Sequence, residues 1–424
     1  MKNKFIKNTM ILILGGFLTK ILGMIIKIIM TRSISQNAIS MYMLTIPSYN
    51  LFITLVNGGF QIAVSKLISE NRCNKKEILS TSLIISFFIS FTLIFVIILL
   101  SKYIPILLHN EDLYYPILST ILSLPFIGIS SILKGYFFGK NMMHVQVISN
   151  FIEQIIRIIL FITILPKINN DILIVSFIIG SNIINELVSI FILSLFLPKK
   201  KIKIMYDKNI KKDILSISIP SMSSRLIGTI SYFFEPIILT NLLILNGFSS
   251  NYINAEYGIV TGYVMQLLLL PSFFSMAISQ SIIPIISNAF YKKKYNYIKK
   301  KINEVLTLSL LIGIIYTSVI ILKPKFFLEL IYNANKGSNY VRMMAPVFIL
   351  LYIQGPIISI LQSINKAKDT MKATIYGTII KILLITVLSF LKLGIYSYII
   401  SILVNIIFVT IYDYIKIKKY TSSF

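Results

Sequence analysis

The sequence predicts an all-α membrane protein that crosses the bilayer about twelve times. The 424-residue chain is 56% hydrophobic and only 13% charged, which is far less charge than soluble domains carry. Its mean hydropathy is +0.83. Apolar runs of about twenty residues recur to the C-terminus, the length that a helix needs to cross a ~30 Å hydrocarbon core. Backbone groups in lipid must be paired internally, so we expect these runs to be helices.

The predicted spans follow the apolar runs in order along the chain. Their ends are set where charged or polar residues interrupt the runs. They cover residues 9–31, 39–65, 79–101, 114–133, 145–165, 172–197, 214–243, 257–287, 304–322, 340–364, 373–391 and 394–415.

Most of the 41 lysine and arginine residues lie on one side of this arrangement. Basic residues favour the cytoplasmic loops of membrane proteins, so the bias predicts a multi-pass protein of the cell membrane with both termini in the cytoplasm. The net charge of +26 is explained by these loops, and we expect no nucleic-acid partner. The basic loops are the N-terminus, 66–78, 134–144, 198–213, 288–303, 366–372 and the tail from 416.

The longest basic loop divides the spans into two groups of six. We therefore expect an N-terminal six-helix lobe at 1–200, a basic cytoplasmic linker at 201–213 and a C-terminal six-helix lobe at 214–424. The segments that start at Ile132 and Ile360 match without a gap at several positions. Two halves with the same orientation would be related by a pseudo-two-fold axis along the membrane normal, with a site between them near the midplane.

Lysines and an arginine inside predicted spans indicate a cationic cavity. Lys20 and Lys27 lie at i and i+7, on one helical face, and each costs on the order of 2.5–3.5 kcal/mol to insert. Arg225 lies in span 7, the counterpart of span 1 in the second half. Arginine and lysine together suit a diphosphate. Neutral hydrogen-bonding side chains are expected beside them at Asn57, Gln61 and Gln280.

The alternative for Lys20 and Lys27 is that they reach the membrane surface or pair with Glu186 or Glu235. Glu153 and Arg157, at i and i+4, are spaced for an ion pair, which would be either structural or functional. Glu186 is a candidate proton or cation site, or a hydrogen-bonded packing residue. We expect an interfacial position for Glu235, and Lys381 has no assigned partner.

Prolines inside spans 2, 7 and 8 are candidate hinges, because proline kinks a helix and frees backbone groups. The alternative is that they are ordinary features of membrane helices. Gly135 and Gly139 are spaced for close helix packing. The candidate hinge residues are Pro47, Pro220, Pro236, Pro271 and Pro284.

The composition argues against several kinds of chemistry. Cys73 is the only cysteine, and His109 and His144 are the only histidines, so neither an intramolecular disulfide nor a Cys/His metal cluster is expected. No Walker A motif is present, so we expect neither a cofactor nor direct use of ATP.

The segments 46–70 and 145–159 resemble the stage V sporulation protein B type of polysaccharide biosynthesis proteins. The resemblance includes Pro47, the run from Ala63 to Leu67, and Glu153 with Arg157. The segment from Lys20 to Gly23 is similar to the basic first-helix motif of the lipid II flippase branch, where a cavity arginine stands in place of Lys20. Members of this type usually have one further helix pair, which forms a lipid-tail groove in the lipid II branch.

This family belongs to the multidrug/oligosaccharidyl-lipid/polysaccharide exporter superfamily. The resemblance implies a MATE-like fold, alternating access and movement of an undecaprenyl-diphosphate-linked saccharide to the outer leaflet. Implied partners are that lipid-linked saccharide, membrane lipids and cell-wall or polysaccharide synthesis enzymes, with the chain as a monomer. The main alternative is a cation-coupled multidrug exporter that uses carboxylates such as Glu186 and Glu153. A polytopic enzyme acting on lipid-linked sugars and a non-transporting scaffold are further alternatives.

Overall fold

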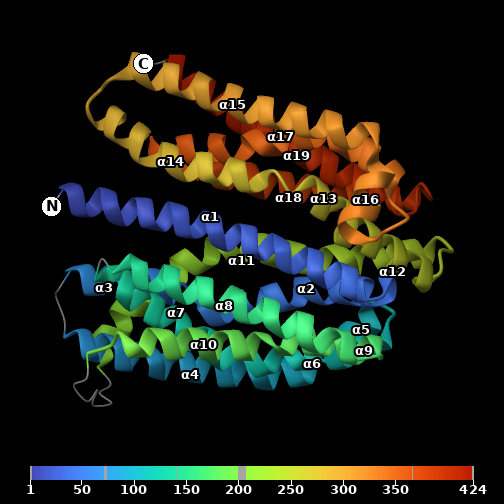
Figure 1. The fold of residues 1–424 in the computed structure, drawn as a ribbon, viewed down its shortest axis with the longest axis horizontal. Helices are drawn as coiled ribbons and strands as arrows, with labels where there is room; N and C mark the ends of the chain where they lie inside the picture. Colours follow the sequence, from blue (N-terminus) through green and yellow to red (C-terminus); the bar gives the residue numbers. More distant parts are fainter. Residues whose placement is uncertain (1, 71–73, 141, 199–206, 365, 423–424) are drawn as a thin grey trace. The chain divides into compact units, whose positions relative to one another are not determined.

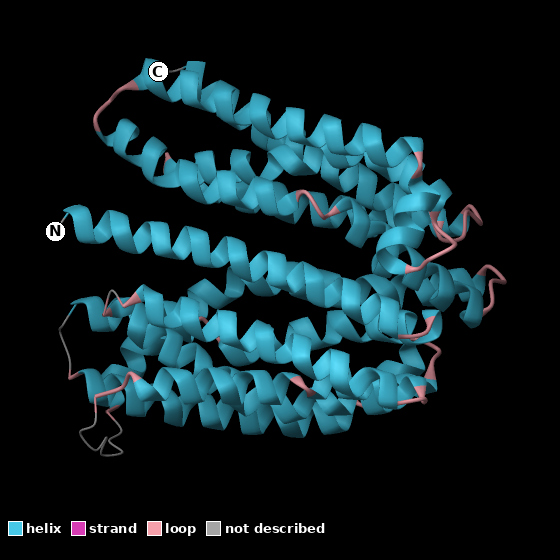
Figure 2. Cartoon of the chain, viewed as in Figure 1, coloured by secondary structure: helices cyan, strands magenta, loops and turns pink. Residues whose placement is uncertain are grey.

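The computed structural model of the chain is built from helices joined by short connections (Figures 1 and 2). It describes residues 2–70, 74–140, 142–198, 207–364 and 366–422, and no strand occurs among them. The side chains of residues 2–13, Pro220, Ser224, Gln280 and Pro284 lie outside the described part. The predicted hinge positions Pro220 and Pro284, the predicted donor Gln280, and residues 201–206 of the predicted linker therefore carry no structural account.

The chain divides into two compact units, Met1–Pro236 and Ile237–Phe424. The boundary falls within one long helix, α11 (Lys208–Leu245). Before α11, the first unit contains α1 (Lys2–Ser33), α2 (Gln36–Asn57), α3 (Phe60–Glu70), α4 (Lys75–Leu100), α5 (Tyr103–Leu107), η1 (Glu111–Leu113), α6 (Tyr114–Ser119), η2 (Thr120–Ser123), α7 (Leu124–Gly139), α8 (Met143–Ile164), η3 (Leu165–Lys167), α9 (Asp171–Gly180) and α10 (Asn182–Leu195).

The second unit follows α11 with nine further helical segments. These are α12 (Ser250–Gly258), the π-helix η4 (Ile259–Val264), α13 (Met265–Leu268), α14 (Ser272–Tyr291), α15 (Tyr295–Leu322), α16 (Pro324–Tyr332), α17 (Ser338–Ser363), α18 (Ala367–Phe390) and α19 (Tyr396–Ser422).

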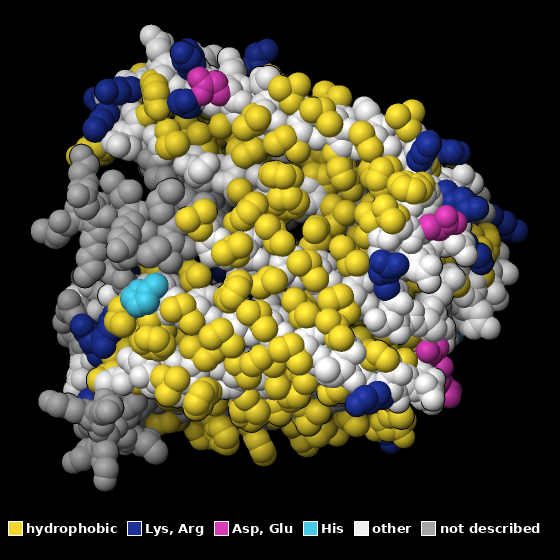
Figure 3. All heavy atoms as spheres, in the orientation of Figure 1, with side chains coloured by type: hydrophobic (Ala, Val, Ile, Leu, Met, Phe, Trp, Pro, Cys, Tyr) yellow, Lys and Arg dark blue, Asp and Glu magenta, His cyan; other side chains and the backbone are white. Residues whose placement is uncertain are grey.

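Twelve helical stretches of the described residues are long and apolar enough to cross a membrane, which confirms the predicted number of spans. Hydrophobic side chains cover the middle of the helices on the face in Figure 3, and lysine and arginine side chains gather toward the helix ends. On α4, the side chains of Phe87, Phe88 and Phe91 are 63%, 66% and 67% exposed. Such surfaces are stable only against lipid, so the chain is a multi-pass membrane protein.

The second predicted span is broken at two glycines. Gly58 and Gly59 separate α2 from α3 and have φ angles of 47° and 70°, a region that glycine enters without steric cost. Pro47, a candidate hinge of this span, lies buried inside α2. Non-helical backbone at membrane depth is tolerated where it is packed in protein or lines a cavity.

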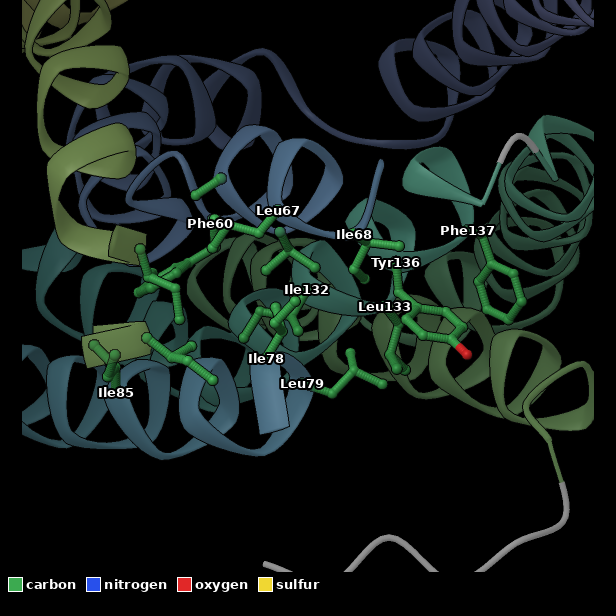
Figure 4. Close-up of a cluster of buried hydrophobic side chains, with 14 of the residues drawn as sticks. Phe60, Leu67, Ile68, Ile78, Leu79, Ile85, Ile132, Leu133, Tyr136 and Phe137 are labelled. Carbon is green, nitrogen blue, oxygen red and sulfur yellow. The ribbon is translucent and has the colours of Figure 1, made fainter. Parts of the chain in front are cut away.

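The core of the first unit packs α3, α4 and α7 together (Figure 4). Phe60, Ile132 and Phe137 are almost fully buried in it. Two glycines of α7 allow α3 to approach closely: a Cβ on Gly135 would lie 2.7 Å from the carbonyl oxygen of Gln61, and one on Gly139 would lie 2.6 Å from that of Ser65. The predicted packing role of both glycines is confirmed by these contacts.

Replacing Gly135 by leucine is expected to destabilise the first unit. The new side chain meets backbone atoms of α3 that cannot move aside, and overpacking of this kind costs about 1–3 kcal/mol. Thermal unfolding of the purified protein in detergent measures the loss. Gly228→Leu is the control, because nothing lies within 4 Å of a Cβ at Gly228. An equal change in melting temperature for both variants would contradict close α3–α7 packing.

The second unit also contains a broken span. α13 ends at Leu268 and α14 begins at Ser272, directly after Pro271. Pro271 has no N–H to bond the carbonyl of Leu267. The hydroxyl of Tyr316 on α15 donates to this carbonyl at 2.7 Å, and the hydroxyl of Tyr352 on α17 donates to the carbonyl of Leu268. Two neighbouring helices therefore satisfy the backbone that the break leaves open.

Candidate functional site

The two lysines of α1 project from its exposed side. The buried side of this helix carries Gly15, Ile26 and Met30, and a Cβ on Gly15 would overlap Val147 of α8. Lys20 and Lys27 are both exposed, and they are near enough for the charge of Lys20 to act on Lys27. Nothing lies within 4 Å of a Cβ at Gly23, between them. This side of α1 is an open, positively charged surface of the first unit.

A third cation lies on α11. Ser218 and Ser221 of this helix pack directly against Gly59, since a Cβ there would lie 2.7 Å from the Ser218 carbonyl oxygen and 2.2 Å from the Ser221 hydroxyl. Arg225 is at i+7 from Ser218, so it lies on the same face of α11. Its side chain is exposed.

Two of the predicted neutral side chains lie at the break that α11 packs against. Asn57 is the last residue of α2, and Gln61 is the second residue of α3. Both are partly exposed. The first unit therefore places Asn57 and Gln61 on either side of this break, and Arg225 lies one helical turn beyond Ser221, which packs against it.

A second group of charges in the first unit is buried and paired. Glu153 of α8 is 8% exposed. One of its oxygens lies 3.6 Å from the Lys134 ammonium group of α7, and the other lies 3.9 Å from the Arg157 guanidinium group. The predicted neighbours Glu153 and Arg157 are thus in contact, and Lys134 is a second cation beside the same carboxylate.

The guanidinium group of Arg157 is held by α10. It donates to the side-chain oxygen of Asn182 at 2.7 Å. In the amide orientation that satisfies both groups, the oxygen of Asn185 accepts from Nε and Nη2 of Arg157 at 2.8 and 2.9 Å. Asn185 is fully buried, so these hydrogen bonds fix the arginine between α8 and α10.

Glu186 joins the same network from α10. The hydroxyl of Ser130 on α7 donates to its carboxylate, and the charges of Lys134, Glu153 and Arg157 act on it. Two carboxylates and two cations thus balance one another among three helices, α7, α8 and α10. A network of this kind holds the three helices in register.

Sequence reasoning missed Lys134 and Ser130. The predicted loop 134–144 begins too early, because α7 continues to Gly139 and Lys134 lies inside it. The close packing of Gly135 and Gly139, one helical turn apart, was the signal that the helix extends past Lys134. The charged residue ends an apolar run in the sequence, but in the structure Glu153 neutralises it.

The remaining predicted residues are distributed along both units. Glu235 is buried in α11, with 3% of its surface exposed. The Lys381 ammonium lies 5.7 Å from the ring centre of Tyr398. Pro236 is inside α11, and Pro271 lies at the α13–α14 break. Among the described residues, no group of three His, Cys, Asp or Glu side chains is arranged to hold a metal ion.

Comparisons with known proteins agree with this architecture. Residues 5–290 match the family described as Polysaccharide biosynthesis protein, and residues 236–387 match the MatE family. Stage V sporulation protein B of Bacillus subtilis (strain 168) is 32% identical over 100% of this chain and 87% of its own length. The lipid II flippase MurJ of the same organism is 25% identical over 91% of this chain and 77% of its own length.

Solved structures show the same fold at low sequence identity. An inward-facing multidrug resistance MATE family transporter of the MOP superfamily superposes with a TM-score of 0.73 and 14% identity, over 96% of this chain and 95% of that chain. The predicted MATE-like two-lobe fold is therefore confirmed.

Proposed function

Because the chain belongs to the polysaccharide biosynthesis protein family, we propose that it is an alternating-access flippase for an anionic lipid-linked saccharide. Its relatives include a lipid II flippase, and its fold is that of a multidrug transporter. Membership of this exporter superfamily argues against an enzyme. The cargo that we propose is an undecaprenyl-diphosphate-linked saccharide, such as a peptidoglycan or polysaccharide precursor.

The observation that carries this proposal is the exposure of Lys20, Lys27 and Arg225 within membrane spans. A charged side chain in the middle of a span is costly in lipid, so it faces protein or a water-filled cavity. Lys134 and Arg157 are cations of the same unit that have carboxylate partners. Among the salt bridges of the described residues, none includes Lys20 or Arg225.

An exposed set of cations selects an anion. A guanidinium group grips phosphate oxygens with two parallel hydrogen bonds, and lysine adds a mobile point charge. A cationic drug would be repelled by the same surface. Asn57 and Gln61 supply neutral hydrogen-bonding groups beside Arg225, which suits the sugar hydroxyls or the phosphate esters of the cargo.

The orientation that we propose has both termini in the cytoplasm, since the basic loops are cytoplasmic by the positive-inside rule. In this orientation we propose that the diphosphate enters from the inner leaflet. We propose that the chain acts as a monomer beside the enzymes that make the lipid-linked saccharide.

Binding measurements on the purified full-length protein test this function. Undecaprenyl diphosphate is expected to bind, to bind more weakly as the salt concentration rises, and to be displaced by inorganic pyrophosphate at high concentration. Ethidium, a cationic dye, is the comparison ligand and is expected to bind at least tenfold more weakly. Tight ethidium binding without diphosphate binding would instead support a cation-coupled multidrug exporter, in which Glu186 and Glu153 take the leading role.

A further inference from the structure

The second unit contains an aspartate that is buried without a hydrogen-bond partner. Asp413 of α19 is 0% exposed, and neither of its carboxylate oxygens has a hydrogen-bond partner among the described residues. The hydroxyl of Thr410, at i−3 on the same helix, is also buried and lacks a partner there. Three oxygen atoms on one face of α19 therefore have no hydrogen bond.

The surroundings of Asp413 are apolar on the side of the unit core. The buried stripe of α19 continues with Ile406 before it and Ile417 after it. Ile417 belongs to a cluster with Ile357 and Ile360 of α17. The turns of α17 that reach this cluster contain no titratable residue. Those of α17 lie in its first and middle turns, at Tyr340, Arg342 and Tyr352.

The charged groups nearest to Asp413 come from the start of α18 and the end of α19. The charge that acts on Asp413 is the like charge of Asp369, in the first turn of α18. Asp369 is itself occupied, since Tyr420 donates a hydrogen bond to it at 2.5 Å and the Lys416 ammonium lies 3.9 Å away. Lys366 lies over the ring of Tyr420. None of the described salt bridges includes Asp413.

The surroundings of Asp413 disfavour its ionised carboxylate and accept its neutral carboxylic acid. An unpaired carboxylate in an apolar site costs several kcal/mol, and a neighbouring carboxylate adds to that cost. Binding one proton removes the charge: an O–H bond forms on the carboxylate, and no second ligand is needed. A calcium ion takes six to eight oxygen ligands, more than these three oxygens of α19 supply, and the described residues contain no group of three His, Cys, Asp or Glu side chains that could hold a metal ion.

We propose that Asp413 is a proton-binding site of the second unit. Thr410, one helical turn away on α19, makes no hydrogen bond to it in the structure. Asp369 is partly exposed, with a side-chain exposure of 14%, and its like charge acts on Asp413. The link of this proton to transport rests on the proposed flippase function, whereas the protonation itself does not.

Infrared difference spectroscopy of the full-length protein tests the site without any substrate. The wild type is expected to show the carbonyl band of a buried protonated carboxylic acid, and this band should disappear as the pH is raised. Asp413→Asn should remove the band, whereas Glu329→Gln, which changes an exposed carboxylate of the same unit, should retain it. Thr410→Val should leave the band in place, because Thr410 makes no hydrogen bond to Asp413. If Asp413→Asn fails to fold, Asp413→Glu should fold and show the band at a different frequency.

Three results would overturn the proposal. The band could persist in Asp413→Asn, it could be absent from the wild type at every pH at which the protein is folded, or it could be abolished by sodium ions at constant pH, which would indicate a metal site. A separate transport arm uses proteoliposomes with an imposed pH gradient, to which the wild type should respond and Asp413→Asn should not. Absence of any lipid-linked saccharide transport would contradict the flippase function and leave the infrared result standing.

Discussion

Replacing Lys20 or Arg225 by glutamine is expected to reduce translocation of a lipid-linked saccharide by at least about tenfold. A hydrogen bond to a charged group contributes about 1.5–3 kcal/mol, and about 1.4 kcal/mol corresponds to a factor of ten. Both side chains are exposed within spans, so the substitutions leave no buried partner behind. The assay measures the appearance of the saccharide on the far side of proteoliposomes that contain purified protein.

Matched variants separate the loss of binding from a loss of folding. Lys102→Gln removes an exposed cation of the same unit outside the spans, and it should transport like the wild type. Arg225→Lys keeps the charge but loses the two parallel hydrogen bonds, so an intermediate rate is expected. Full activity of Lys20→Gln, Lys27→Gln and Arg225→Gln, each tested alone, would be incompatible with a cationic substrate cavity.

Replacing Glu153 by alanine is expected to destabilise the first unit by about 3–5 kcal/mol, the usual cost of removing one partner of a buried ion pair. The substitution removes the carboxylate next to both Lys134 and Arg157, and it leaves Glu186 as the one acidic member of the network that faces two cations. Thermal unfolding in detergent measures the effect. The double variant Glu153→Ala with Lys134→Ala should recover part of the loss, because residues in contact are not additive.

An exposed ion pair of the same spacing provides the control. Lys325 and Glu329 lie at i and i+4, with their charged atoms 3.7 Å apart and their side chains 69% and 43% exposed. Such pairs contribute about 0–1 kcal/mol, so Glu329→Ala should hardly change the melting temperature. Equal effects of Glu153→Ala and Glu329→Ala would show that the buried network does not hold α7, α8 and α10 together.

The number of spans could be predicted because the apolar runs alone determine it, but the breaks could not. Pro47 is the candidate hinge of span 2, and the sequence pattern does not indicate the break at Gly58 and Gly59. The reason is a contact with a distant segment: Ser218 and Ser221 of α11 occupy the space that a side chain at Gly59 would need. A pattern read along one span contains no information about such a neighbour.

The candidate site was predictable to the extent that it depends on charge inside apolar runs. This signal identified Lys20, Lys27, Arg225, Glu153 and Glu186. Pairing was harder to predict, since Lys134 ends an apolar run and was assigned to a loop. Its partner Glu153 lies on the next helix, and only the packing of α7 on α8 makes a lysine acceptable at that depth. The amides of Asn182 and Asn185 that hold Arg157 come from a third helix, α10. Their pairing likewise depends on helix packing that the sequence pattern does not contain.

The tyrosine hydroxyls at the α13–α14 break limit how the second unit can change shape. Tyr316 and Tyr352 tie the carbonyls of Leu267 and Leu268 to α15 and α17. The Leu267 carbonyl also accepts from the N–H of Leu270, so pulling α13 away from α17 would leave one acceptor, that of Leu268, unbonded at a cost of about 1–3 kcal/mol. Beyond the break, the hydroxyl of Ser275 on α14 donates to the carbonyl of Tyr352. The segments before and after Pro271 are therefore both fastened to α17, and a bend at Pro271 must either carry α17 along or break one of these bonds.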